Sequence, residues 1–193
     1  MIHAFTRYFQ TKFPHHIRHM HYTVMFIALA QLLLSNGMHI NKEGVIRDTA
    51  VAQFSTWAHI GFGCVFLLLI IAFTLVELRT HGFRYFYPYL WGDWRQIKSD
   101  IAQLRQRKLP DAEPQGLAAC VQGLGLGAGL LVAASGAIWL GLWLTDSVLA
   151  HEAKDLHKML TGLIEAYIVG HGGLGLLHIY LSSKKQDQRD AKK

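Results

Sequence analysis

The chain has little cysteine, few acidic residues and no internal repeat. Its two cysteines, Cys64 and Cys120, lie in or beside apolar runs, with neither metal-ligand spacing nor the pattern of a disulfide framework, so we interpret them as packing residues. The absence of repeats and low-complexity segments favours one domain over residues 1–193. The N-terminus also lacks the pattern of a cleaved signal peptide, because a histidine-rich basic stretch runs directly into an apolar segment.

The composition is apolar instead. Hydrophobic residues make up 51% of the chain and its mean hydropathy is +0.20, which is too apolar for an ordinary soluble domain of this size. Four apolar stretches are long enough to cross roughly 30 Å of hydrocarbon. They cover residues 21–38, 53–78, 117–144 and 156–181. The sequence therefore predicts an all-α fold, an integral membrane four-helix bundle.

The basic residues lie mainly on one side of these spans. Three of the 19 Lys and Arg precede the first span, seven lie between the second and third spans, and five lie in the tail, so 15 share one side. The positive-inside rule then predicts a multi-pass protein of the bacterial inner membrane with both termini in the cytoplasm. The net charge of +6 thus indicates topology and contact with anionic membrane lipid, and not nucleic-acid binding.

The loop between the second and third spans has an amphipathic pattern. Trp91 and Trp94 are followed by Ile97, Ile101 and Leu104, which is helical spacing with charged residues between. We expect an interfacial helix lying on the cytoplasmic surface of the membrane. The alternative is an ordinary solvated helix within a loop.

Histidines inside apolar spans are the most informative residues. The last span carries His157 and His171, and on an α-helix their 14-residue step places them about 40° apart in angle and roughly 21 Å apart along the axis. They cannot reach one metal ion, so they suit two separate centres at two depths. His59 of the second span lies at the depth of His157, and His21 of the first span lies at the depth of His171.

This pattern predicts two imidazole pairs, an outer pair of His59 with His157 and an inner pair of His21 with His171. Imidazole is a standard axial ligand of haem iron, and ionisable residues within a membrane usually have a function. Glycines flank these histidines and recur along the third span, which suits either a flat porphyrin or close helix packing. A transition-metal transporter that uses the histidines as a relay is a further alternative. On residues alone, three neighbours compete with His21: His15, His16 and His19.

These residues resemble the prokaryotic di-haem cytochrome b561-like proteins, and most closely the formate dehydrogenase gamma (cytochrome b556) type. An aromatic residue, an Arg three residues before a His and a following aromatic residue match the stretch from Phe13 through Arg18 to His21 and Tyr22. This match favours His21 over His19. A His with a nearby Gly in the second span and two His 14 residues apart in the last span also match. The resemblance covers residues 13–183.

The resemblance implies two haem b groups, each held by two histidines, with His21, His59, His157 and His171 as the ligands of the haem iron. It also implies a quinone site near the cytoplasmic haem. Residues at the start of the third span and the inner ligand border that site in the formate dehydrogenase branch. Carried over to this chain, the candidates for quinone binding are Gln115, Gly116 and His171, and His178 matches a further His of some members.

We therefore expect an electron-transfer subunit of a quinone-linked oxidoreductase complex. It would carry electrons across the membrane between the quinone pool and a periplasmic oxidoreductase or iron-sulfur subunit, docked on outer loops at residues 39–52 and 145–156. These loops are too short to hold an active site of their own. The alternative is a stand-alone cytochrome b561 that exchanges electrons between quinone and a small diffusible species.

Overall fold

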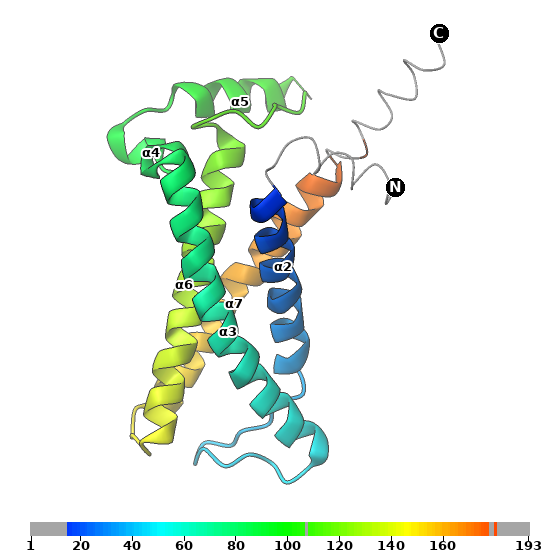
Figure 1. The fold of residues 1–193 in the computed structure, drawn as a ribbon, viewed down its shortest axis with the longest axis vertical. Coiled ribbons are helices and arrows are strands. Elements are labelled where there is room, and N and C mark those ends of the chain that lie inside the picture. Colours follow the sequence, from blue (N-terminus) through cyan, green and yellow to red (C-terminus); the bar gives the residue numbers. More distant parts are fainter. Residues whose placement is uncertain (1–14, 107, 178–179, 181–193) are drawn as a thin grey trace. The chain divides into compact units, whose positions relative to one another are not determined.

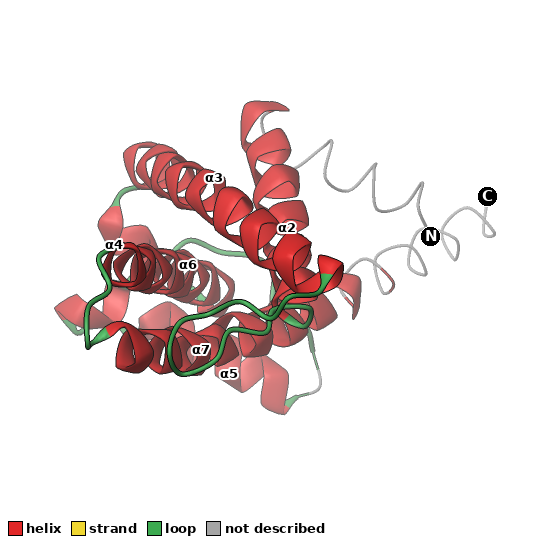
Figure 2. Ribbon diagram, turned by 90° about the horizontal axis from the view of Figure 1, so that it is seen from below, coloured by secondary structure: helices red, strands yellow, loops and turns green. Residues whose placement is uncertain are grey.

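The computed structural model describes residues 15–106, 108–177 and 180. In these residues the chain consists of helices and loops without a β-strand, as the coloured ribbon in Figure 2 shows. The long helices are α2 (His15–Ser35), α3 (Ala50–His81), α6 (Leu117–Leu144) and α7 (Ala150–Tyr167) (Figure 1). Between α3 and α6 lie α4 (Phe83–Phe86), the 3-10 helix η1 (Pro88–Trp91) and α5 (Arg95–Arg105), and α7 runs on into the π-helix η2 (Ile168–Gly172).

Four of the described helical segments are long and apolar enough to cross a membrane: Ile17–Ser35, Ala50–His81, Leu117–Leu144 and Ala150–Leu177. Large apolar side chains stay exposed along them, as expected where lipid replaces water as the surrounding medium, and examples are Phe26 at 69%, Phe54 at 70% and Leu68 at 70%. The all-α membrane fold is therefore confirmed.

The helix boundaries differ most from the apolar runs at the starts of α2 and α7. α2 begins at His15, so His21 lies six residues inside the helix and not at its start, because helical hydrogen bonding continues through the polar histidines that precede the apolar run. α7 begins at Ala150, six residues before the predicted start of the last span. Its first turns carry the charged residues Glu152, Lys154 and Asp155. These residues are compatible with a helix at a polar surface, but their low hydropathy keeps them out of the predicted apolar span.

The described residues divide into two compact units. Unit 2 contains residues 19–76 and 126–164, and unit 1 contains the described parts of residues 1–18, 77–125 and 165–193. In unit 2, α3 and α6 approach closely at Gly129, where an added Cβ would lie 3.0 Å from Cγ1 of Ile70. In unit 1, Phe86 and Pro88 are fully buried, and the amphipathic helix α5 buries Ile97 and Asp100.

Candidate functional site: two histidine positions on separate units

Within unit 2, α3 and α7 bring His59 and His157 together. The centroids of the two imidazole rings lie 6.3 Å apart, with 73° between the ring planes. Both side chains are half-buried. The structure thus brings together the two histidines that the sequence assigned to the outer pair.

The Nδ1 atom of each ring is engaged by a neighbouring helix. His59 Nδ1 lies 3.2 Å from the backbone oxygen of Gln31, and because a carbonyl oxygen only accepts, Nδ1 carries the proton and donates it. The Gln31 amide Nε2 in turn donates to the backbone oxygen of His59 at 3.1 Å. α2 and α3 are therefore joined at the level of the ring, and the ring's orientation is fixed.

His157 has the same arrangement through a hydroxyl group. Its Nδ1 lies 3.0 Å from Ser135 Oγ, while Ser135 donates its own proton to the backbone oxygen of Val132 at 2.8 Å. Since the hydroxyl has only one proton to give, His157 Nδ1–H is the donor to Ser135. Both rings are thus tautomers with an unprotonated Nε2, and this is the nitrogen that a metal requires.

The pair fits a haem iron. An imidazole nitrogen binds a metal at about 2 Å, so two imidazoles that shared one metal would have ring centroids roughly 6 Å apart, close to the observed separation. α6 presents Gly136 to the His157 ring, where an added Cβ would lie 3.0 Å from Cε1. The small residues of the third helix thus give the candidate ligand room. When bound, haem b would supply one-electron redox chemistry at this point.

Replacing Ser135 with alanine tests the support of the His157 ring. We expect the outer haem to bind about 10- to 100-fold more weakly, which is the usual effect of losing a group that orients a ligand. Haem titration of the apoprotein followed by absorbance measures this affinity. The control is Ser147→Ala, whose hydroxyl accepts from Leu149 N at 3.3 Å in a loop. An unchanged affinity in Ser135→Ala would contradict the assigned role.

His21 and His19 differ in their surroundings. His21 is half-buried, and its ring centroid lies 6.4 Å from that of Phe73 on α3, in an edge-to-face arrangement. His19 is exposed. Both residues belong to α2, and the burial agrees with the motif in favouring His21 as the ligand.

His171 lies in unit 1, within the π-helix η2. Its ring is stacked on Tyr167, with the centroids 4.9 Å apart and 8° between the planes. Tyr167 in turn lies against Gly125 of α6, where an added Cβ would overlap the phenol ring. A π-helical turn inside an α-helix is rare and is frequent at functional sites. Because His171 and His21 belong to different units, their pairing stays a prediction.

The π-helix η2 alters the predicted angle between His157 and His171. The 40° angle between His157 and His171 assumes 100° per residue throughout, whereas the i→i+5 hydrogen bonds of η2 make a wider turn. The angle therefore does not hold beyond Tyr167. Glycines at positions 170, 172 and 173 make this segment easy to distort, and nothing lies within 4 Å of a Cβ added to any of them.

Two further candidates for quinone binding, Gln115 and Gly116, lie in the turn before α6. Gln115 has a φ of 63° in the turn before α6, and Gly116 is buried there. A Cβ at Gly116 would lie 2.5 Å from Asp100 Oδ2, so packing against this carboxylate already requires a glycine. His178 lies outside the described residues.

Three supporting residues escaped the sequence reasoning: Gln31, Ser135 and Asp100. Asp100 is 1% exposed, and it accepts from Leu117 N at 2.7 Å at the start of α6, where a negative charge stabilises a helix. Each had a signal, since Gln31 and Ser135 are polar residues within apolar runs. Asp100 lies three residues after Ile97, on the same helical face.

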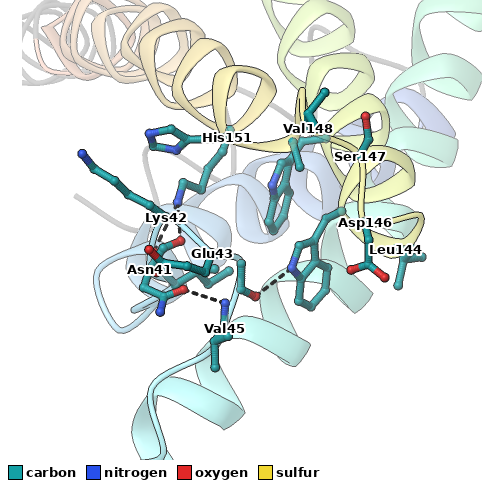
Figure 3. A pocket seen from close by; sticks show the side chains of 15 residues that line it. Asn41, Lys42, Glu43, Val45, Leu144, Asp146, Ser147, Val148 and His151 are labelled. Atoms are coloured by element: carbon teal, nitrogen blue, oxygen red, sulfur yellow. Dashed lines mark hydrogen bonds between the residues drawn. The ribbon is translucent and has the colours of Figure 1, made fainter.

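A loop pocket lies on unit 2, between residues 40–45, the end of α6 and the start of α7 (Figure 3). Its volume is about 540 Å³. Trp143 Nε1 donates to Gly44 O at 2.9 Å, and Lys154 Nζ donates to the oxygens of Ile40 and Asn41, both at 3.2 Å. Gly44 has a φ of 81° and leaves no room for a Cβ beside the indole. The two loops expected to face outward are thereby held to each other.

The comparison with protein families decides the classification. The family model described as prokaryotic cytochrome b561 matches residues 12–186. The chain belongs to the prokaryotic cytochrome b561 family. It is accordingly a multi-pass membrane protein that binds haem b and transfers electrons. A comparison with curated proteins and one with solved structures each found no match.

His59 and His157 form a pair of histidine side chains within unit 2. Among the described residues, no group of three or more His, Cys, Asp or Glu side chains comes together as at a multi-ligand metal site.

Proposed function

We propose that this chain is the di-haem membrane subunit of a quinone-linked oxidoreductase, closest to the formate dehydrogenase gamma type. His59 and His157 hold the outer haem b, and His21 and His171 hold the inner one. Electrons pass between a periplasmic oxidoreductase or iron-sulfur subunit and the quinone pool. The observation that carries the proposal is the His59–His157 pair, with both Nδ1 protons engaged and both Nε2 atoms available.

Each part of the chain has one task in this proposal. The ligand rings keep their orientation through Gln31 and Ser135, so that electron transfer requires little rearrangement of the protein. The apolar spans keep water away from both centres and lower the local dielectric constant. The quinone site lies beside the inner haem in the bacterial inner membrane, with Gln115, Gly116 and His178 as its candidate residues.

One feature of the loop pocket supports docking of a periplasmic partner, and another supports the stand-alone cytochrome. Its two loops are fixed by Trp143 and Lys154, which gives a docking protein a preformed surface. Its volume of about 540 Å³ also lies within the range of small-molecule sites. This second feature supports the alternative, a stand-alone cytochrome b561 that takes electrons from a small diffusible donor.

Isolation of the tagged chain from native membranes in mild detergent separates the two functions. The proposal predicts co-purification of an iron-sulfur subunit and reduction of both haems through it. Trp143→Phe tests the docking surface, because it keeps an aromatic ring but removes the hydrogen bond to Gly44 and should weaken this association. A chain that elutes alone with its haems, and is reduced by a small soluble donor, would establish the alternative.

A further inference from the structure

A buried carboxyl group and a partly exposed imidazole form a pair in unit 1, near the C-terminal end of α3. The Glu77 side chain is 1% exposed, and its Oε2 lies 3.2 Å from Nδ1 of His81, one turn further along. His81 is 33% exposed, so the pair extends from the interior of the unit to its surface. Gln122 Nε2 on α6 donates to the same Glu77 oxygen at 3.1 Å. A buried carboxyl group is costly compared with apolar packing even when it is hydrogen-bonded, so packing alone does not account for it.

The neighbouring phenols do not exchange protons near neutral pH. Burial raises the pKa of the Tyr85 hydroxyl, and the negative charges of Glu77 and Glu113 raise it further. Tyr85 stacks on His81, with ring centroids 4.7 Å apart. Burial likewise raises the pKa of Tyr87, whose hydroxyl donates to Gly123 O at 2.7 Å. The phenols are therefore not the acid–base groups of this cluster, which leaves the carboxyl of Glu77 and the imidazole of His81.

α6 links this pair to the inner redox position within the same unit. Gln122, which contacts Glu77, is three residues from Gly125, which lies against Tyr167. Residues three apart are neighbours on the surface of a helix. Tyr167 is stacked on His171, the candidate inner ligand. The basic loop that follows His81 also marks this end of α3 as the cytoplasmic end.

We propose that His81 and Glu77 form a proton path between the cytoplasm and the quinone beside His171. The path rests on the proposed function. Reduction of one quinone to quinol takes two electrons, supplied by haem b, and two protons. Each proton passes from solvent to His81, then to Glu77, and from there to a quinone oxygen. Oxidation of quinol runs the same steps in reverse.

Stopped-flow oxidation of the pre-reduced holoprotein by duroquinone tests the path, with the haem absorbance as the signal. We expect Glu77→Gln to slow the reaction by about 100-fold, the scale of a positioned proton transfer, and to flatten its pH profile. Haem content and spectrum should stay those of the natural chain. His81→Gln should show the same slowing, and Glu77→Asp should recover part of the rate.

The matched control is Gln122→Met, which removes a hydrogen bond to Glu77 but leaves the acid–imidazole pair. A merely structural cluster would make this variant as slow as Glu77→Gln, whereas the path predicts a rate close to that of the natural chain. Unchanged rate and pH profile in both Glu77→Gln and His81→Gln would overturn the path. If Glu77→Gln loses haem, the exposed His81→Gln decides the question.

Infrared difference spectra, taken on electrochemical reduction of the quinone-free holoprotein, give a readout besides activity. The path predicts a carboxyl band that Glu77→Gln removes and Gln122→Met retains. If the holoprotein carries two haems and does not react with quinone, the proposed function fails, and this band still shows whether Glu77 exchanges protons. Absence of the band from the natural chain would overturn the path.

Discussion

Replacement of His157 by alanine should remove one of two haems from each chain and leave the other spectrally intact. His157 and His59 form one pair, and their Nδ1 atoms contact Ser135 and Gln31. Both Nε2 atoms are therefore left to bind one haem iron. Loss of either ring leaves the iron with one protein ligand. We therefore expect the haem-to-protein ratio, measured by absorbance of the reduced protein, to fall from about two to about one.

His59→Ala should give the same ratio, and the double variant should lose nothing more, because both residues serve one centre. His151→Ala is the matched control, since this residue lies on α7, is 37% exposed and contacts Asp155 at 3.7 Å. Two haems retained in both His59→Ala and His157→Ala would contradict the outer pair.

The second large effect is expected at the inner centre. His171→Ala and His21→Ala should each remove the other haem and abolish reaction with quinone, while the outer haem remains reducible by dithionite. His19→Ala is the control on the same helix, because His19 is exposed whereas His21 is half-buried. The measurement is again haem content, combined with duroquinone oxidation kinetics.

The haem content of the two α2 variants can also contradict the choice of His21 as the ligand. Loss of a haem in His19→Ala, together with two haems in His21→Ala, would exchange the two residues. Loss of the same haem in His157→Ala and His171→Ala would contradict the division of α7 and η2 between two centres.

Much of the fold could be predicted from the sequence because the membrane imposes strong patterns. The third span matches α6 at both ends, and the apolar content of the others placed all four segments. The loop helix also appears as α5, with Ile97 buried and Ile101 at 40% exposure. Boundaries shifted where helical residues are polar, as at Ala150, because hydropathy detects lipid contact and not hydrogen bonding.

The site was predictable as residue types at matching depths and not as detailed geometry. Depth placed His59 with His157, since both lie at the same level of their helices. It could not show that Gln31 and Ser135 fix the tautomers, because these contacts join residues 28 and 22 positions apart along the chain. Nor could a count of 100° per residue foresee the π-helix at His171, which depends on how glycines relax the local turn.

The haem content of the purified chain tests the central claim most directly. Dithionite-reduced protein, isolated in mild detergent, should show the absorbance of b-type cytochrome with two haems per chain. A reduced spectrum without that absorbance, or a stoichiometry of one haem that neither His157→Ala nor His171→Ala lowers, would contradict two bis-histidine centres.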